Sequence, residues 1–255
     1  MKNEQTIRDC AIYSLDNLAL IKHGQNCSCC FREIESEEVE EIRDIQILSG
    51  NLGSIQTQAS YLKDGFWSDR GSTTREFNLN DSGTNPKSGL ITYSLGNNLR
   101  DSDGLHNGLS NLFRESFKLF EETLGINFLE ITEYSTSASI NITNNNSGAW
   151  ASSYVLNGST GRSRINISDS WVNYYGSNFG QYTLQTVHHE IGHALGLGHQ
   201  GNYNGSANYE NDAKFTNDSW QSSIMSYFSQ SENTTINASR VYLMTPSAVD
   251  WLALD

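Results

Sequence analysis

The chain has 255 residues, of which 36% are hydrophobic, and it carries a formal net charge of −13 at pH 7. This composition fits a globular protein, and the acidity disfavours nucleic acid and anionic lipid as partners. The sequence contains no run of 18 apolar residues, and its start lacks the basic end and apolar block of a secretory signal. We therefore expect neither a membrane span nor a cleavable N-terminal signal peptide.

The cysteines are confined to the start of the chain, at Cys10, Cys27, Cys29 and Cys30. A glutamate-rich run, FREIESEEVEEIRDIQ, follows them, and the composition then changes to Asn, Ser, Gly and aromatic residues. We predict a leader or pro-segment at residues 1–45 and one domain at residues 46–255. The glutamate run fits a solvated helix face at least as well as a binding surface. The domain lacks cysteine, so it folds without disulfides, and cysteine usage leaves the compartment open.

Strand-like and helix-like segments alternate along the domain. Residues 88–95 (SGLITYSL) predict a strand, and residues 108–125 predict an amphipathic helix whose apolar side chains recur at helical spacing. Gly125 is expected to end that helix. Short β-rich runs and a second helix follow, at residues 126–133, 138–144, 163–169 and 182–196.

The order of these segments predicts a twisted mixed sheet with helices packed on it, an α/β or α+β fold class. Near the C-terminus, TPSAVDWLALD predicts a helix with Thr245 as its N-cap and Pro246 in its first turn. The chain has no internal repeat and no glycine-aspartate nonapeptide repeat. The sequence therefore leaves calcium binding open, because no motif predicts a calcium site.

The second helix carries the most specific motif, HHEIGHALGLGH at residues 188–199. His189 and His193 are four residues apart, so both project from one helix face, close enough to share one metal ion. Glu190 is rotated by about 100° around the helix axis, where it can reach a water at that metal without being a ligand. Gly196 breaks the helix, so that the chain can return His199 as a third ligand.

Three imidazoles with an open fourth position describe a catalytic zinc site. A histidine pair alone is common on helix surfaces, but HExxHxxGxxH fixes five positions in eleven. A purely structural zinc would favour four protein ligands and cysteine, which the domain lacks. His188 faces another way and is expected to pack or to lie at the surface. His23 and His106 receive no role.

The motif resembles the zinc signature of the metzincins, and SSIMSYF at residues 222–228 resembles their Met-turn, with Met225 under the zinc. Within that group the chain is most similar to the serralysin family of bacterial secreted proteases. The resemblance covers about residues 85–255 and is strongest at residues 180–228.

The resemblance implies a metzincin-type catalytic domain with one zinc ion bound by His189, His193 and His199. It implies that Glu190 is the general base, which takes a proton from water at the zinc and passes it to the leaving amine. Tyr227 stands where the family has a tyrosine that ligates zinc in the resting enzyme and swings to stabilise the oxyanion. The segment SGAWASSYVLNGS resembles the edge strand that pairs with an extended substrate.

Two features depart from the family pattern. Serralysins usually continue into a calcium-binding repeat domain with the export signal, so either this sequence is part of a longer chain or the domain travels differently. Serralysin leaders also normally lack cysteine. One of Cys27, Cys29 and Cys30 could cap the zinc in an uncleaved zymogen, or all three could be idle thiols in a flexible leader; the second reading is favoured.

We expect a monomeric, zinc-dependent endopeptidase that hydrolyses protein or peptide substrates outside a bacterial cell, by an export route that the sequence leaves open. The alternative is a non-catalytic, zinc-containing module that only binds peptides. Glu190 favours the enzyme, because a binding module needs no general base.

Overall fold

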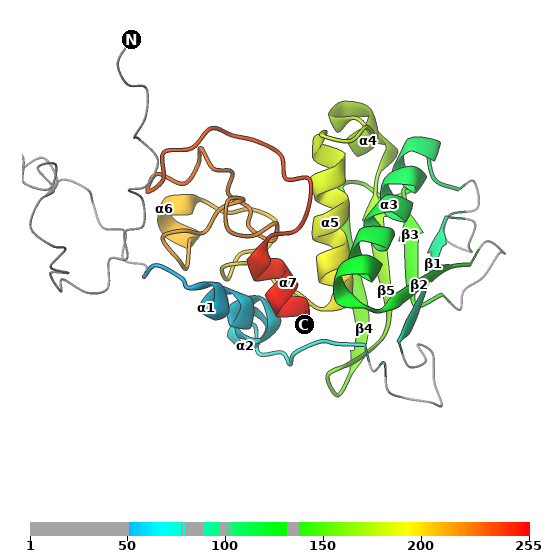
Figure 1. Cartoon of the computed structure of the whole chain (residues 1–255), viewed down its shortest axis with the longest axis horizontal. Helices are drawn as coiled ribbons and strands as arrows, with labels where there is room; N and C mark the ends of the chain where they lie inside the picture. The colour runs from blue at the N-terminus through cyan, green and yellow to red at the C-terminus, as the bar shows by residue number, and fades with distance from the viewer. Residues whose placement is uncertain (1–50, 78, 80–88, 97–100, 102–103, 132–137) are drawn as a thin grey trace, which may run out of the picture. The chain divides into compact units, whose positions relative to one another are not determined.

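The computed structural model describes residues 51–77, 79, 89–96, 101, 104–131 and 138–255 (Figure 1). The predicted leader at residues 1–45 lies outside the described residues and stays a prediction. Among the described residues, no helix combines the length and the apolar character that crossing a membrane requires.

A five-stranded mixed sheet organises the domain, in the order β2-β1-β3-β5-β4. The first four strands in this spatial order, β2 to β5, run parallel to one another, and the last, β4, runs antiparallel to β5. The strands are β1 (Leu90–Leu95), β2 (Asn127–Glu130), β3 (Ile140–Thr143), β4 (Ala149–Leu156) and β5 (Ser159–Ile167). The mixed α/β architecture confirms the predicted fold class, and the segment expected to form an edge strand is β4, at one edge of the sheet.

Two long helices, α3 (Asn107–Leu124) and α5 (Tyr182–Leu195), lie side by side against one face of the sheet (Figure 1). Gly125 ends α3 with φ 68°, a left-handed conformation that glycine adopts without a Cβ penalty. His106 caps the other end, because its Nδ1 accepts a hydrogen bond from the Gly108 amide at 3.1 Å. Both helices confirm the sequence prediction.

The main core fills the space between these helices and the sheet. The apolar stripe of α3 is buried there, with Leu109, Leu112, Phe113, Phe117 and Phe120 at most 1% exposed. The isoleucines of β3 and β5 face the stripe from the sheet, and Ile142 pairs with Ile165 across the two strands. Helical spacing on one side and strand alternation on the other thus produce one continuous apolar layer.

A helical segment that the sequence did not predict precedes the sheet. It begins as α1 (Ile55–Ser60), widens into the π-helical turn η1 (Tyr61–Gly65) and ends as α2 (Phe66–Asp69). Leu62 and Ala59 from this segment pack with Leu197 and Met225 in a second apolar cluster. This segment therefore contacts the chain just beyond the histidine helix.

The short helices are α4 (Asp169–Tyr175), α6 (Tyr209–Asp212) and α7 (Ala248–Leu254). The prediction for α7 is wrong at its start: Ser247 is the N-cap, not Thr245. Ser247 forms a capping box with Asp250, which satisfies two orphan amides at once, so the helix starts after Pro246 rather than around it.

Candidate functional site

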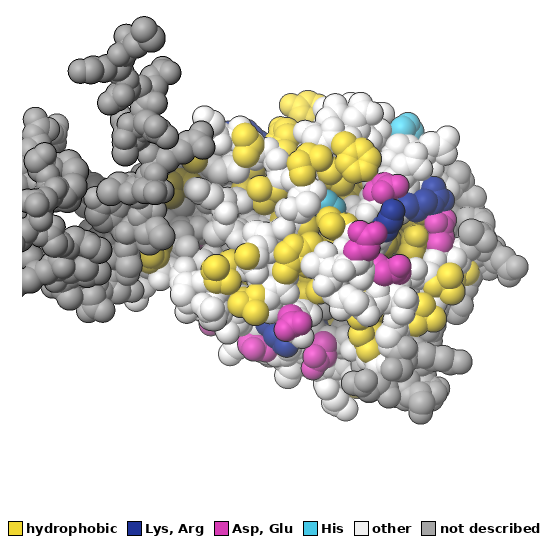
Figure 2. Space-filling view, viewed as in Figure 1, with side chains coloured by type: hydrophobic (Ala, Val, Ile, Leu, Met, Phe, Trp, Pro, Cys, Tyr) yellow, Lys and Arg dark blue, Asp and Glu magenta, His cyan; other side chains and the backbone are white. Residues whose placement is uncertain are grey.

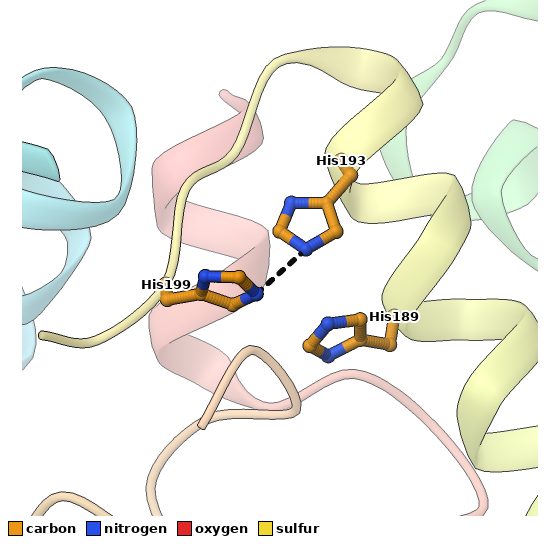
Figure 3. A group of neighbouring side chains, drawn as sticks. All are labelled: His189, His193 and His199. Atoms are coloured by element: carbon orange, nitrogen blue, oxygen red, sulfur yellow. Dashed lines mark hydrogen bonds between the residues drawn. The ribbon is translucent and has the colours of Figure 1, made fainter. Parts of the chain in front are cut away.

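The three predicted histidines meet at the C-terminal half of α5 (Figure 3). His189 and His193 project from one face of the helix. Gly196 ends the helix with φ 119°, and the chain turns back to place His199 opposite them. One ring nitrogen from each histidine lies within 4.8 Å of the other two. The structure thus brings together residues that the motif predicted as ligands.

Backbone carbonyls hold all three rings through Nδ1. The partners are the oxygen of Ile224 for His189 at 2.9 Å, of Leu197 for His193 at 2.8 Å and of Tyr203 for His199 at 2.9 Å. A carbonyl can only accept, so each Nδ1 carries the proton and each Nε2 presents a lone pair. Metal-binding histidines have this tautomer when a carbonyl or carboxylate accepts from the ring nitrogen that does not bind the metal.

The contact between His193 and His199, dashed in Figure 3, places their Nε2 atoms 2.9 Å apart. With both Nδ1 protons engaged, two lone pairs face each other, and they repel unless a cation lies between them. A proton is disfavoured there, because burial lowers the pKa of His193 to about 3 and that of His199 well below its usual value. The donor set therefore fits a zinc ion, whose nitrogen ligands lie about 2.0–2.1 Å from the metal.

Glu190 lies beside the histidines but outside the cluster of ligand atoms. Its side chain is 5% exposed, and Oε2 has no hydrogen-bond partner among the described residues. Burial raises the pKa of this carboxyl to about 8, because the charged form loses its hydration. A carboxylate with a spare acceptor atom next to a cation site is suited to exchanging a proton.

A cavity of about 540 Å³ opens in front of Glu190 and the histidines His189 and His193. Residues 149–151 of the edge strand β4 form one side of it. The indole and phenol groups that line another part are Trp171, Tyr182 and Trp220. Trp171 donates to Thr186 and Trp220 to the Ser226 carbonyl, so the indole N–H groups are satisfied within the protein and the rings offer apolar faces.

Met225 lies under the histidine helix, as predicted for a Met-turn. It is fully buried, and a Cβ added at Gly192 would come within 2.7 Å of its sulfur. The glycine inside the motif thus permits the close approach of the turn to the helix. Gly196 is restricted in a similar way, since a Cβ there would collide with the Arg75 carbonyl.

Tyr227 follows Met225 by two residues and faces the cavity. Its ring packs edge-on against His199, with the centroids 4.4 Å apart, and its hydroxyl accepts a hydrogen bond from the Gly205 amide at 3.2 Å. Burial raises the pKa of this phenol, so the hydroxyl keeps its proton at neutral pH. Tyr227 therefore lies beside the imidazole cluster with a hydrogen to donate.

Sequence reasoning missed the residues that support the histidines. Asp250 accepts hydrogen bonds from the Ser223 hydroxyl at 2.6 Å and the Ile224 amide at 2.9 Å, and Ile224 in turn holds His189. Asp218 accepts from the Tyr203 hydroxyl at 3.1 Å, and the Tyr203 carbonyl holds His199. No local motif signals either carboxylate, because each acts through a contact distant in sequence.

The remaining candidates fall elsewhere. His188 is 2% exposed and packs near Phe120 in the core, so it is a packing residue. The candidate cysteines Cys27, Cys29 and Cys30 lie outside the described residues, as does His23.

Two family models match the chain. A matrixin (Peptidase_M10) model matches residues 85–205, and a Met-zincin model matches residues 177–242. The first ends just after the three histidines, and the second extends from α5 across the Met-turn.

Curated relatives also match part of the chain. Serralysin C of Dickeya chrysanthemi is 44% identical over 70 residues, and serralysin A of the same organism is 42% identical over 66 residues. These alignments cover 25% and 24% of this chain but only 15% and 13% of the relatives. The chain thus spans a small part of the length of the serralysins that it matches.

Solved structures with a partly similar fold include myroilysin and a fish hatching enzyme, HCE-1 of Oryzias latipes. Myroilysin is 20% identical, with a TM-score of 0.38 and coverage of 68% of this chain and 94% of that one. The hatching enzyme is 15% identical, with a TM-score of 0.34 and coverage of 64% and 85%. The assignment rests on the sequence matches instead: the two family models together place residues 85–242 among the metzincin metalloproteases.

Proposed function

We propose that the domain is a zinc-dependent, serralysin-like endopeptidase that cleaves extended protein or peptide substrates. One observation carries the proposal: three imidazoles present their Nε2 lone pairs to one point, at the wall of a cavity that also holds the buried carboxyl of Glu190. His189, His193 and His199 would hold the ion. When bound, zinc would supply a Lewis acid and lower the pKa of water at its open position.

Glu190 would act as general base and then as general acid. Its carboxylate would accept a proton from the attacking water at Oε2, which has no other partner in the described part of the chain, and would return it to the departing amine nitrogen. A cation beside it would favour the ionised form and so offset the burial that raises its pKa.

Tyr227 would stabilise negative charge on the carbonyl oxygen of the substrate. Its hydroxyl already accepts from Gly205, which leaves its own hydrogen to donate into the cavity. The same residue is the candidate fourth zinc ligand of the resting site. The position of this phenol supports both roles, because it lies beside His199 on the open side of the imidazole cluster.

The substrate would bind as an added strand along β4. That strand pairs with β5 on one side, lies at the edge of the sheet and contributes residues 149–151 to the cavity. Main-chain hydrogen bonds to such an edge supply affinity, and the cavity walls select the side chain. The apolar faces of Trp171, Tyr182 and Trp220 favour an apolar side chain.

Zinc analysis combined with a protease assay tests the proposal. The purified chain should contain about one zinc ion, and it should hydrolyse casein until a chelator removes the metal. His193→Ala should lose most of the zinc and the hydrolysis together. A chain that binds zinc but cleaves no protein would instead support the peptide-binding module, and full zinc retention in His193→Ala would contradict the ligand set.

We further propose that the enzyme acts outside a bacterial cell. The resemblance to serralysins supports this location. Detection of chelator-sensitive hydrolysis in the culture medium of the producing cells would test it, and activity restricted to the cell interior would contradict it.

A further inference from the structure

The helical segment at Ile55–Asp69 contacts every position of the loop that leads from α5 to the third histidine, residues 196–199. The Trp67 indole donates to the Gly196 carbonyl at 2.8 Å, and the Gly198 amide donates to the Leu62 carbonyl at 2.7 Å. Leu197 packs with Leu62 in the second apolar cluster. The Phe66 ring lies edge-on to His199, with centroids 5.2 Å apart.

The π-helical turn explains why this segment can bind the loop. The Phe66 amide donates to the Tyr61 carbonyl five residues back, instead of to the Leu62 carbonyl four residues back. The Leu62 carbonyl is thereby released from its α-helical partner and accepts from Gly198. Single π turns inside α-helices often occur at functional sites for this reason.

The packing leaves the loop no room to shift toward the helix. A Cβ added at Gly198 would collide with the Phe66 ring, and one added at Gly196 would collide with the Arg75 carbonyl. The Trp67 ring is held in place as well, because the Arg75 guanidinium lies over it, with Cζ 3.6 Å from the ring centroid.

The loop serves two of the three histidines. It carries His199, and its Leu197 carbonyl accepts the Nδ1–H of His193 at 2.8 Å. A displacement of the loop would therefore misplace one imidazole and remove the orienting partner of another. The matched family models begin at residues 85 and 177, so both leave this helical segment outside.

We infer that Phe66 and Trp67 are positioning residues for the metal centre, which act on His193 and His199 through the loop at residues 196–199. The inference rests on the proposed zinc site. It predicts that zinc retention depends on a helix that provides no ligand.

Trp67→Phe in the full chain tests the inference, because it removes one hydrogen bond and keeps an aromatic ring. Zinc release into excess chelator should become about 10-fold faster. This is the lower end of the loss in metal affinity found when residues that hold metal ligands in place are substituted. The visible absorption of the cobalt-substituted protein should also change, since ligand geometry changes.

Tyr61→Phe is the matched control. It removes one hydrogen bond from the same helical segment, from the Tyr61 hydroxyl to Asp69 at 2.7 Å, which does not touch the loop. Its zinc release should stay within about two-fold of the parent, well below the roughly 10-fold change expected when a residue that holds metal ligands in place is substituted. Thermal unfolding of both metal-free variants shows whether the two changes destabilise the fold equally.

Phe66→Leu provides a second variant should Trp67→Phe not fold. The inference would be overturned if a folded Trp67→Phe or Phe66→Leu protein released zinc as slowly as the parent and Tyr61→Phe. The cobalt spectra would then also equal those of the parent and of Tyr61→Phe. A parent chain that binds no zinc would instead refute the proposed function, so the two failures are distinguishable.

Discussion

The two sides of the domain are stabilised by different means. The sheet, α3 and α5 enclose a core of apolar side chains, and strand ladders pair their backbone groups. Residues 196–247, all described, contain no strand of the sheet and one helix, the four-residue α6, among turns, bends and isolated bridges. Buried polar side chains pair backbone groups there, among them Ser219, Ser223, Ser226, Asn233 and Asp250.

The proposed metal centre lies where these two regions meet. Helix α5 from the first region supplies His189 and His193, and the second region supplies His199 and the carbonyls that orient the rings. The difference teaches that a rigid site does not require regular secondary structure around it. It requires that every backbone group near the ligands has a partner.

The sheet region should respond most strongly to the loss of apolar volume. Phe117→Ala removes a ring that is 1% exposed and stacks on Tyr93 with centroids 4.2 Å apart. Deleting a buried phenylalanine costs about 3–5 kcal/mol of unfolding free energy, through lost burial and a residual cavity. Urea unfolding measures the change. A loss below about 1 kcal/mol would contradict the view that this layer is the main core.

The irregular region should respond most strongly to the loss of one carboxylate. Asp250→Ala leaves the Ser223 hydroxyl and the Ile224 and Ser247 amides without their acceptor, which lies 2.6–2.9 Å away in the parent. We expect a loss of about 3 kcal/mol in the free energy of unfolding, because hydrogen bonds to a buried charged group are among the strongest.

A surface carboxylate serves as the control for Asp250. Glu122 on α3 only approaches Lys118, at 4.0 Å, and both side chains are about two-thirds exposed. Glu122→Ala should change the unfolding free energy by less than about 0.5 kcal/mol. Equal effects of the two substitutions would show that buried carboxylates do not stabilise the irregular region.

Sequence predicted the regular region far better than the irregular one. The apolar stripe of α3 and the histidine spacing on α5 are local patterns with a 3.6-residue period, so they specify helices without tertiary information. The start of α7 was misplaced because Thr245–Pro246 and the capping box of Ser247 compete within three residues.

The supporting residues of the site were beyond sequence reasoning. Trp67 contacts Gly196, which is 129 positions away, and Asp250 contacts Ile224, 26 positions away. The segment at Ile55–Asp69 was missed because its π turn breaks the helical period. The three histidines that cluster in the structure were predicted together because one short motif holds them all.

Tyr227 separates function from stability within the irregular region. Tyr227→Phe keeps the ring against His199 and removes only the hydroxyl. We expect turnover to fall by about 10²-fold, with a smaller change in KM, because the lost donor acts mainly in the transition state. Steady-state kinetics on a peptide substrate measures both constants. Parental turnover in a folded variant would remove the tyrosine from the mechanism.

Asp218 predicts a pH dependence that is specific to the irregular region. Burial raises the pKa of this carboxyl to about 7, although the Tyr203 and Ser226 hydroxyls hydrogen-bond to it and lower the value. The unfolded chain has the ordinary pKa of about 4, so the folded state holds the extra proton between about pH 4 and pH 7. The stabilisation from this group is thus present below about pH 4 and is lost as the pH rises to about 7.

Asp218→Asn should remove that dependence. Relative to the parent, the variant should gain stability as the pH rises through this range, which urea midpoints at several pH values would reveal. The amide keeps one acceptor for Tyr203, so the substitution removes the titrating group without removing that hydrogen bond. Parallel pH profiles of parent and variant would contradict the assignment.

The most direct test of the central claim compares zinc content with hydrolysis in Glu190→Gln. The three imidazoles remain, so the variant should keep about one zinc ion per chain, while peptide hydrolysis should fall by about 10²–10⁴-fold because the proton acceptor is lost. Near-parental hydrolysis in a folded, zinc-containing Glu190→Gln protein would contradict the account.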